Sequence, residues 1–172
     1  KFAKLIGFIR PTNFGMLFNV RSVGKAIDLA YTSKALSVHT DNPYRKPIPG
    51  IQLLHCLKND SVGGKSTLTD GFAVSEYLRK RFPDIFKILS TVKIRYTYQD
   101  KYTHLENWGE TIELNDTNKI KRVRLSPRID YVPVLNKKRL ENFYKARAFF
   151  IKLCNSKKFM IEFKLAPGDM LV

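Results

Sequence analysis

Two residues in the first part of the chain, His39 and Asp41, have side chains that could hold a metal ion. They stand two positions apart, and in an extended strand alternate residues point to the same face. The imidazole and the carboxylate would therefore project together. Non-haem iron(II) oxygenases bind their metal with two histidines and one carboxylate on one face and keep the remaining positions open. The pair supplies two ligands of such a site, although an isolated His-x-Asp motif also recurs by chance.

The other histidines, His55 and His104, are not expected to complete this set of ligands. His55 falls within residues 51–57, an almost continuously apolar run that predicts a strand buried on both faces. A core histidine is therefore expected there. His104 lies in a polar stretch and is expected to be a loop residue exposed to solvent.

The size and composition of the chain indicate one globular domain with a sizeable core, since 44% of its 172 residues are hydrophobic. The net charge of +16 would suit an anionic partner. The basic residues are widely spread, however, and no nucleic-acid-binding motif accompanies them. We therefore expect a lysine-rich surface and no nucleic-acid partner, with a non-catalytic basic binding module as the open alternative.

Hydropathy and cysteine content bear on the compartment. No apolar stretch approaches the roughly 20 residues that span a bilayer, so no membrane association is expected. Cys56 and Cys154 lie far apart and form no Cys-x-x-Cys motif. They are typical of reduced thiols. We expect a cytoplasmic protein, or a mitochondrial one in a eukaryote.

Hydrophobic periodicity predicts many short strands with a few inserted helices. Asp70 is the expected N-cap of a helix over 71–82, Pro83 begins a second helix to 89, and 137–154 form an amphipathic helix. This order favours a β-sandwich or jelly roll with helices packed outside. The segments expected to be strands are 14–20, 51–57, 66–69, 92–98, 112–114, 120–125 and 159–165, with another after the turn at 167–169.

Several motifs resemble one enzyme family in the same order. They are Ala30-Tyr31-Thr32, His39-Thr40-Asp41, residues 49–58, Gly63-Gly64-Lys65-Ser66, Asp70-Gly71-Phe72 and residues 164–172. From about Phe14 onwards the chain resembles the gamma-butyrobetaine dioxygenase and trimethyllysine dioxygenase group of Fe(II)/2-oxoglutarate oxygenases, which is related to taurine dioxygenase. The resemblance implies a mainly β fold with flanking helices: a double-stranded β-helix (jelly roll), incomplete at its C-terminal end.

The resemblance also implies a reaction. Members of this family couple the oxidative decarboxylation of 2-oxoglutarate by O2 to the hydroxylation of a substrate C–H bond, with Fe(II) as cofactor and ascorbate as reductant. The implied substrate is a small quaternary amine, gamma-butyrobetaine in carnitine biosynthesis. Trimethyllysine and other betaine-type or taurine-type substrates are the alternatives. A homodimer is one assembly that this reading allows.

Site residues follow from the resemblance position by position. His39 and Asp41 match the first two iron ligands, while the distal histidine and the arginine that binds 2-oxoglutarate would lie beyond residue 172. Leu54 matches a residue that lines the 2-oxoglutarate site. Ser66 matches a hydroxyl that relatives use to hold a carboxylate of 2-oxoglutarate. A turn hydroxyl bonded to the backbone is the alternative for Ser66.

The substrate side is implied in the same way. Phe14, Phe18 and Tyr31 match an aromatic cage, which holds a trimethylammonium group by cation–π attraction. Asp28 stands where a neutral amide occurs in the butyrobetaine enzymes, and Asn42 stands where those enzymes have a tyrosine. The alternative for Phe14 and Phe18 is a role in the core.

The ends of the sequence predict an internal part of a longer protein. The chain begins at Lys1, and an apolar run follows the turn at 167–169. We expect residues 1–172 to be a single partial catalytic domain, truncated at both ends. By itself it would be inactive, since it would lack the third ligand and the arginine.

Overall fold

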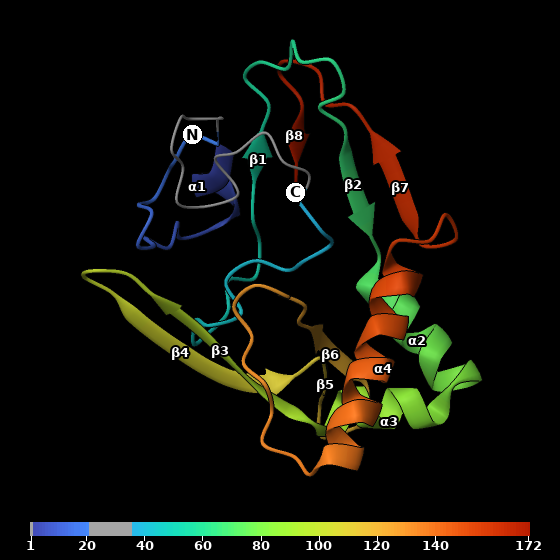
Figure 1. Ribbon diagram of the computed structural model, residues 1–172. Coiled ribbons are helices and arrows are strands. Elements are labelled where there is room, and N and C mark those ends of the chain that lie inside the picture. Colours follow the sequence, from blue (N-terminus) through green and yellow to red (C-terminus); the bar gives the residue numbers. More distant parts are fainter. Residues whose placement is uncertain (1, 21–35) are drawn as a thin grey trace.

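Small antiparallel sheets and helices make up the protein in the computed structural model, which describes residues 2–20 and 36–172 (Figure 1). Each sheet in this part of the chain has two strands. The sheets pair β1 (Leu54–His55) with β8 (Met170–Leu171), β2 (Ser66–Thr69) with β7 (Met160–Phe163), β3 (Lys93–Gln99) with β4 (His104–Glu110), and β5 (Ile112–Leu114) with β6 (Ile120–Val123). The helices are α1 (Phe2–Ile6), α2 (Gly71–Arg81), α3 (Pro83–Thr91) and α4 (Lys137–Cys154).

The four sheets differ in how far apart their strands are in the sequence. β3–β4 and β5–β6 are local hairpins, and β5–β6 has a bulge between Glu113 and Leu114. β1–β8 and β2–β7 instead bring the end of the chain back to residues 54–69. Figure 1 shows these two long-range sheets side by side at the top of the view, above the hairpins and the helices α2, α3 and α4, with β2 leading directly into α2.

The hydrophobic core lies where α2, α3 and α4 pack against one another and against the hairpins (Figure 1). Leu78, Leu89 and Phe150 of the helices and Ile112 of β5 have no exposed surface. Each such side chain contributes about 1.5–3 kcal/mol by leaving water. Because this core backs the β5–β6 hairpin, it gives the residues after β6 a fixed position.

Asp70 caps the N-terminus of α2, as the sequence predicts. The side chain of Asp70 accepts a hydrogen bond of 2.9 Å from the backbone N–H of Ala73. That N–H belongs to the first turn and has no partner inside the helix. The helix follows β2 directly, so the cap also fixes where the strand ends.

Most expected elements are present, but α1 was not expected, and two further errors concern residues 14–20 and β4. Residues 14–20 form no strand: Gly15 has a φ of +93°, and Thr12 and Gly15 form a turn with two backbone hydrogen bonds. A left-handed glycine interrupts an extended chain. β4 was not expected, because Asn107 and Gly109 have low strand propensity, and its pairing with β3 overrides that preference.

Expectations for residues 51–57, for His55 and for His104 also need correction. In the apolar run 51–57 only Leu54 and His55 form a strand, and His55 is exposed, so it is not a core histidine. His104 is exposed as expected, but it begins β4 instead of lying in a loop.

The jelly roll is not confirmed, since the described strands pair only two by two. No helix in residues 2–20 or 36–172 combines the length and the apolar character needed to cross a bilayer.

Replacing the cap residue should cost stability. We expect Asp70→Ala to lower the free energy of unfolding by about 1 kcal/mol, measured by urea denaturation. Asp60→Ala is the matched control, because Asp60 forms only a surface ion pair with Lys58 and its side chain is 69% exposed. The control should stay within about 0.5 kcal/mol of the wild type. Equal losses in the two variants would contradict the capping role.

Candidate metal centre

His39 and Asp41 face each other, as their spacing predicts. His39 Nε2 lies 3.3 Å from Asp41 Oδ1, and His39 Nδ1 lies 2.7 Å from the carbonyl oxygen of Ser37. A carbonyl can only accept a hydrogen bond, so Nδ1 carries the hydrogen and donates to it. Nε2 is therefore the atom turned towards the carboxylate. A second ring nitrogen fixed by a backbone carbonyl is the usual arrangement of a histidine that binds a metal.

The electrostatics of the pair favour a positive charge between the two side chains. The hydrogen bond with Asp41 raises the pKa of His39, and the same contact lowers the pKa of Asp41. A proton can supply this charge, and so can a metal ion. Both residues are accessible, with side chains that are 24% and 46% exposed.

His39 Nε2 and Asp41 Oδ1 are placed as two ligands of one metal ion would be. Ligands at right angles around an ion, with bonds of about 2.1 Å, are about 3 Å apart. The separation of 3.3 Å between Nε2 and Oδ1 is close to that value. Within residues 2–20 and 36–172 no group of three or more His, Cys, Asp or Glu side chains could hold a metal ion. A third protein ligand of such a site would come from outside these residues.

Hydrogen bonds to the end of β6 hold the pair in place. Residues 36–53 form neither helix nor strand. Thr40, between the two candidate ligands, donates its backbone N–H to the carbonyl of Leu125 at 2.6 Å, and its hydroxyl accepts from the N–H of Leu125 at 3.0 Å. Because Thr40 faces Leu125, its two neighbours point away from that contact. His39 and Asp41 therefore lie on the same side of the backbone, as in a strand, although residues 36–53 form none.

A tight turn follows Asp41. Asn42 has a φ of +54°, a left-handed conformation that asparagine tolerates better than most residues. The N–H of Arg45 donates to the Asn42 carbonyl at 3.1 Å, and the Tyr44 hydroxyl donates to Asn42 Oδ1 at 2.8 Å. Burial raises the pKa of Tyr44 to about 12, so its hydroxyl keeps the proton that it donates.

Aromatic rings gather beside this turn. The Phe14 ring lies 5.8 Å from that of Phe18 and 5.8 Å, edge on, from that of Tyr98. Tyr98 in turn stacks on Tyr44 at 5.1 Å. Phe18 is 49% exposed, which excludes a core role in the described structure. The sequence singled out Phe14 and Phe18, but Tyr44 and Tyr98 join them only through tertiary contacts.

The protein family described as "Taurine catabolism dioxygenase TauD, TfdA family" matches residues 1–172. The chain belongs to this family. It is 35% identical over 168 residues to a gamma-butyrobetaine dioxygenase of Pseudomonas sp. (strain AK-1), covering 98% of this chain and 44% of that protein. It is 36% identical over 180 residues to the gamma-butyrobetaine dioxygenase of Homo sapiens, covering 99% and 45%.

A second group of relatives matches a shorter part of the chain. The mitochondrial trimethyllysine dioxygenase of Bos taurus is 38% identical over 110 residues, covering 64% of this chain and 25% of that protein. The chain therefore spans less than half the length of these TauD/TfdA-family relatives. The family resemblance inferred from the motifs is confirmed.

The remaining residues expected from the resemblance lie on separate elements or outside the described chain. Leu54 is half-buried in β1, opposite Leu171 of β8. Ser66 begins β2, opposite Phe163 of β7. Asp28 and Tyr31 lie outside the described residues. The roles of all four stay predictions.

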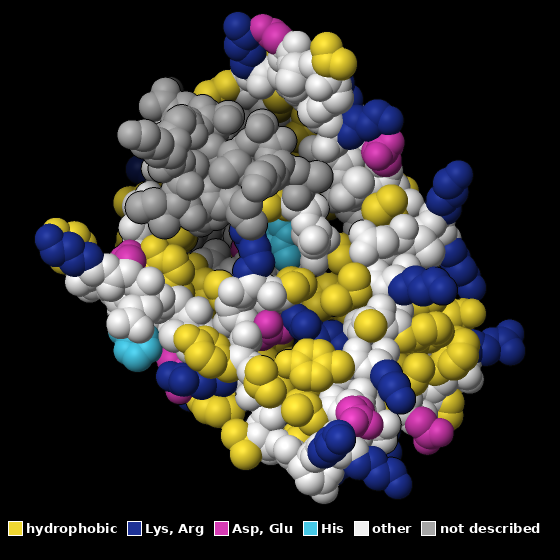
Figure 2. All heavy atoms as spheres, in the orientation of Figure 1, with side chains coloured by type: hydrophobic (Ala, Val, Ile, Leu, Met, Phe, Trp, Pro, Cys, Tyr) yellow, Lys and Arg dark blue, Asp and Glu magenta, His cyan; other side chains and the backbone are white. Residues whose placement is uncertain are grey.

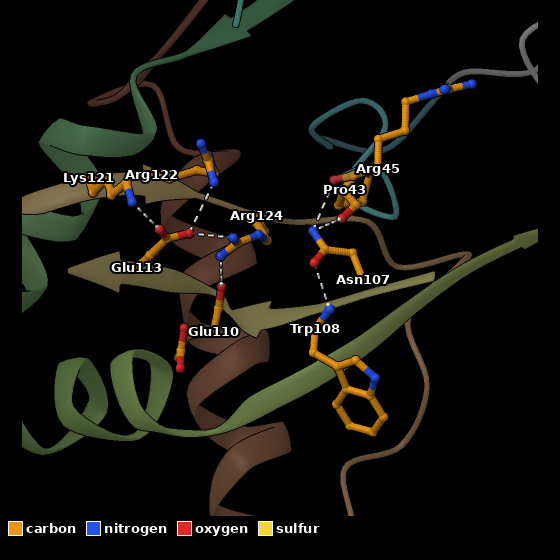
Figure 3. A network of polar contacts seen from close by, with 9 residues as sticks. All are labelled: Pro43, Arg45, Asn107, Trp108, Glu110, Glu113, Lys121, Arg122 and Arg124. Atoms are coloured by element: carbon orange, nitrogen blue, oxygen red, sulfur yellow. Dashed lines mark hydrogen bonds and ion pairs between the residues drawn. The ribbon is translucent and has the colours of Figure 1, made fainter. Parts of the chain in front are cut away.

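A buried arginine lies next to Leu125, the partner of Thr40, and was not expected from the sequence. Arg124, directly before Leu125, is 5% exposed and pairs with Glu113. Lys121 and Arg122 also point to Glu113, at 3.1 Å and 3.2 Å (Figure 3). Burial alone would raise the pKa of Glu113, but the hydrogen bond from Lys121 and the charges of Arg124 and Arg122 outweigh it and lower the pKa.

This lowered pKa predicts a pH-dependent contribution to stability. A carboxylate whose pKa is lower in the folded state stabilises the fold above its unfolded pKa of about 4.3, and the contribution is lost as pH falls towards the folded value. Glu113→Gln should therefore lower the free energy of unfolding at pH 6. The difference from the wild type should shrink as the pH is lowered towards 3. Urea denaturation at several pH values measures this, and a constant difference would contradict it.

Proposed function

We propose that the intact protein is an Fe(II)- and 2-oxoglutarate-dependent dioxygenase that hydroxylates a quaternary amine, with gamma-butyrobetaine as the preferred substrate. The observation that carries the proposal is the His39–Asp41 pair, with Nε2 and Oδ1 3.3 Å apart. It has the residue types and the spacing of the two-histidine, one-carboxylate iron site. Membership of the TauD/TfdA family supports the same chemistry.

The chain's own residues would hold and orient the metal. His39 would bind through Nε2 and Asp41 through Oδ1, while the Ser37 carbonyl keeps the imidazole in the required tautomer. When bound, iron supplies the open positions at which 2-oxoglutarate and O2 react. We place the distal histidine and the arginine for 2-oxoglutarate outside residues 1–172, because relatives are more than twice as long. Leu54 and Ser66 would contact 2-oxoglutarate.

The aromatic rings beside the turn support a cationic substrate. A trimethylammonium group has no N–H donors, so aromatic faces are its best partners. Phe14 and Phe18 are in contact and accessible enough to take part, and Asp28 and Tyr31 would complete the pocket. The gamma-butyrobetaine relatives match 98–99% of the chain, whereas the bovine trimethyllysine relative matches 64%. This difference favours gamma-butyrobetaine over trimethyllysine.

The alternative of a non-catalytic basic binding module has less support. On the described part of the face shown in Figure 2, Lys and Arg side chains are dispersed, at the rim and nearer the centre, and interspersed with Asp and Glu. They form no continuous patch on that face. A nucleic-acid partner needs such a patch or stripe to follow its phosphates.

The proposal predicts amine-dependent turnover. With Fe(II), ascorbate and 2-oxoglutarate, the intact protein should release succinate, and gamma-butyrobetaine should stimulate that release more than trimethyllysine. Asp41→Ala should abolish it, because one ligand is lost, whereas Asp60→Ala at the exposed Lys58 ion pair should not change it. Succinate is quantified by mass spectrometry. No stimulation by any amine would refute the substrate, and full activity of Asp41→Ala would refute the site.

A further inference from the structure

Asn107 of β4 is bonded to the turn that carries the candidate metal ligands. Its Nδ2 donates to the carbonyl of Pro43 at 3.1 Å and to the carbonyl of Arg45 at 3.0 Å (Figure 3). Its Oδ1 accepts from the N–H of Trp108 at 3.0 Å, so the amide is held on its own side as well. Pro43 and Arg45 are both buried. One side chain thus binds two points of the same turn from a distant strand.

We infer that Asn107 is a positioning residue for the metal centre, because its side-chain amide fixes the turn that places Asp41 opposite His39. This inference rests on the proposed function. Asn107 does not touch the ligands. It would act through the backbone of residues 42–45, which follows Asp41 without a break.

The turn behaves as one unit because it is closed on itself. The contact from the Arg45 N–H to the Asn42 carbonyl, at 3.1 Å, joins its two ends, and the Tyr44 hydroxyl binds the Asn42 side chain at 2.8 Å. A displacement at Pro43 or Arg45 would therefore reach Asn42 and the carboxylate before it. Thr40, bonded to Leu125, would stay where it is. The separation of the two ligands would then change.

The strand that carries Asn107 is itself fixed close to Leu125, the residue to which Thr40 is bonded. At Gly109, two residues along β4, an added Cβ would come within 2.5 Å of the Arg124 guanidinium. That guanidinium therefore lies directly on the Gly109 backbone. Arg124 also donates to the Glu110 carbonyl at 3.2 Å, and its backbone N–H donates to the Thr111 carbonyl at 2.8 Å. Leu125, the partner of Thr40, is the next residue.

Two anchors therefore hold the segment that carries the candidate site. The first is the pair of hydrogen bonds between Thr40 and Leu125, and the second is the pair of bonds from Asn107 to the turn. Arg124 connects the two anchors, because it precedes Leu125 and contacts β4. Residues 36–53 have no helix or strand of their own to set their shape. The two anchors replace that regular structure. Asn107 is the anchor that secures the Asp41 side.

The experiment compares metal affinity in the intact protein and in Asn107→Ala and Asn107→Asp. The aspartate variant keeps the shape of the side chain and its bond to Trp108 but loses both N–H donors. The probe is Mn(II), followed by electron paramagnetic resonance at a temperature where circular dichroism shows each variant folded. Both variants should bind Mn(II) about tenfold more weakly, the range found when residues that support metal ligands are removed. The turnover rate should fall with the affinity.

Asn115→Ala is the matched control. Asn115 also uses its side chain to hold a turn, accepting from the N–H groups of Thr117 and Lys119, but that turn joins β5 to β6 and contacts Arg79 of α2. Its Mn(II) affinity should equal that of the wild type. Folded Asn107 variants with unchanged affinity would overturn the positioning role, as would an equal loss in Asn115→Ala. A wild type that neither binds Mn(II) nor turns over would overturn the proposed function instead.

Should Asn107→Ala fail to fold, Asn107→Asp decides the question. Gly109→Ala provides an independent variant, because an added Cβ would come within 2.5 Å of the Arg124 guanidinium, so that β4 or the guanidinium that connects it to Leu125 must shift while Asn107 itself is unchanged. It should weaken Mn(II) binding in the same direction. Unchanged affinity in folded Gly109→Ala and Asn107→Asp would overturn the inference.

Discussion

The hydrogen bonds between Thr40 and Leu125 connect two parts of the molecule that differ in how they are stabilised. Leu125 follows β6, in a hairpin backed by the helical core, where burial of side chains such as Phe150 and Ile112 supplies the stability. Thr40 belongs to a stretch without regular structure. Its backbone and hydroxyl together pair with both polar groups of Leu125. The core thereby supports a segment that makes little core of its own.

A buried cation lies next to this connection. Removing a guanidinium from water costs several kcal/mol unless hydrogen bonds and an opposite charge compensate. Arg124 has Glu113 as its counter-ion and the Glu110 carbonyl as a further acceptor. Three cations share the single Glu113 carboxylate, in a chain that already carries a net charge of +16. The position next to Leu125 is thus held by directional contacts, which apolar packing alone would not provide.

Sequence patterns predicted the elements that depend on interactions between residues close together in the chain. The Asp70 cap and the apolar periodicity of residues 137–154 located α2 and α4, and the spacing of His39 and Asp41 indicated the candidate ligands. β4 could not be predicted, because its strand conformation depends on β3. The contacts of Asn107 with the turn and of Tyr98 with Tyr44 could not be predicted for the same reason. Their partners are distant in sequence, and neither residue type nor spacing identifies them.

The left-handed backbone at Asn42 constrains how this segment can change in evolution. The residue combines a positive φ with a side chain that accepts from the Tyr44 hydroxyl. A larger residue at this position would meet steric strain there, and it would leave that buried hydroxyl without its acceptor. A substitution would therefore have to be accompanied by a different turn and by a change at residue 44. Positions 42 and 44 should covary among relatives, so that the residue that follows Asp41 indicates which turn a given protein uses.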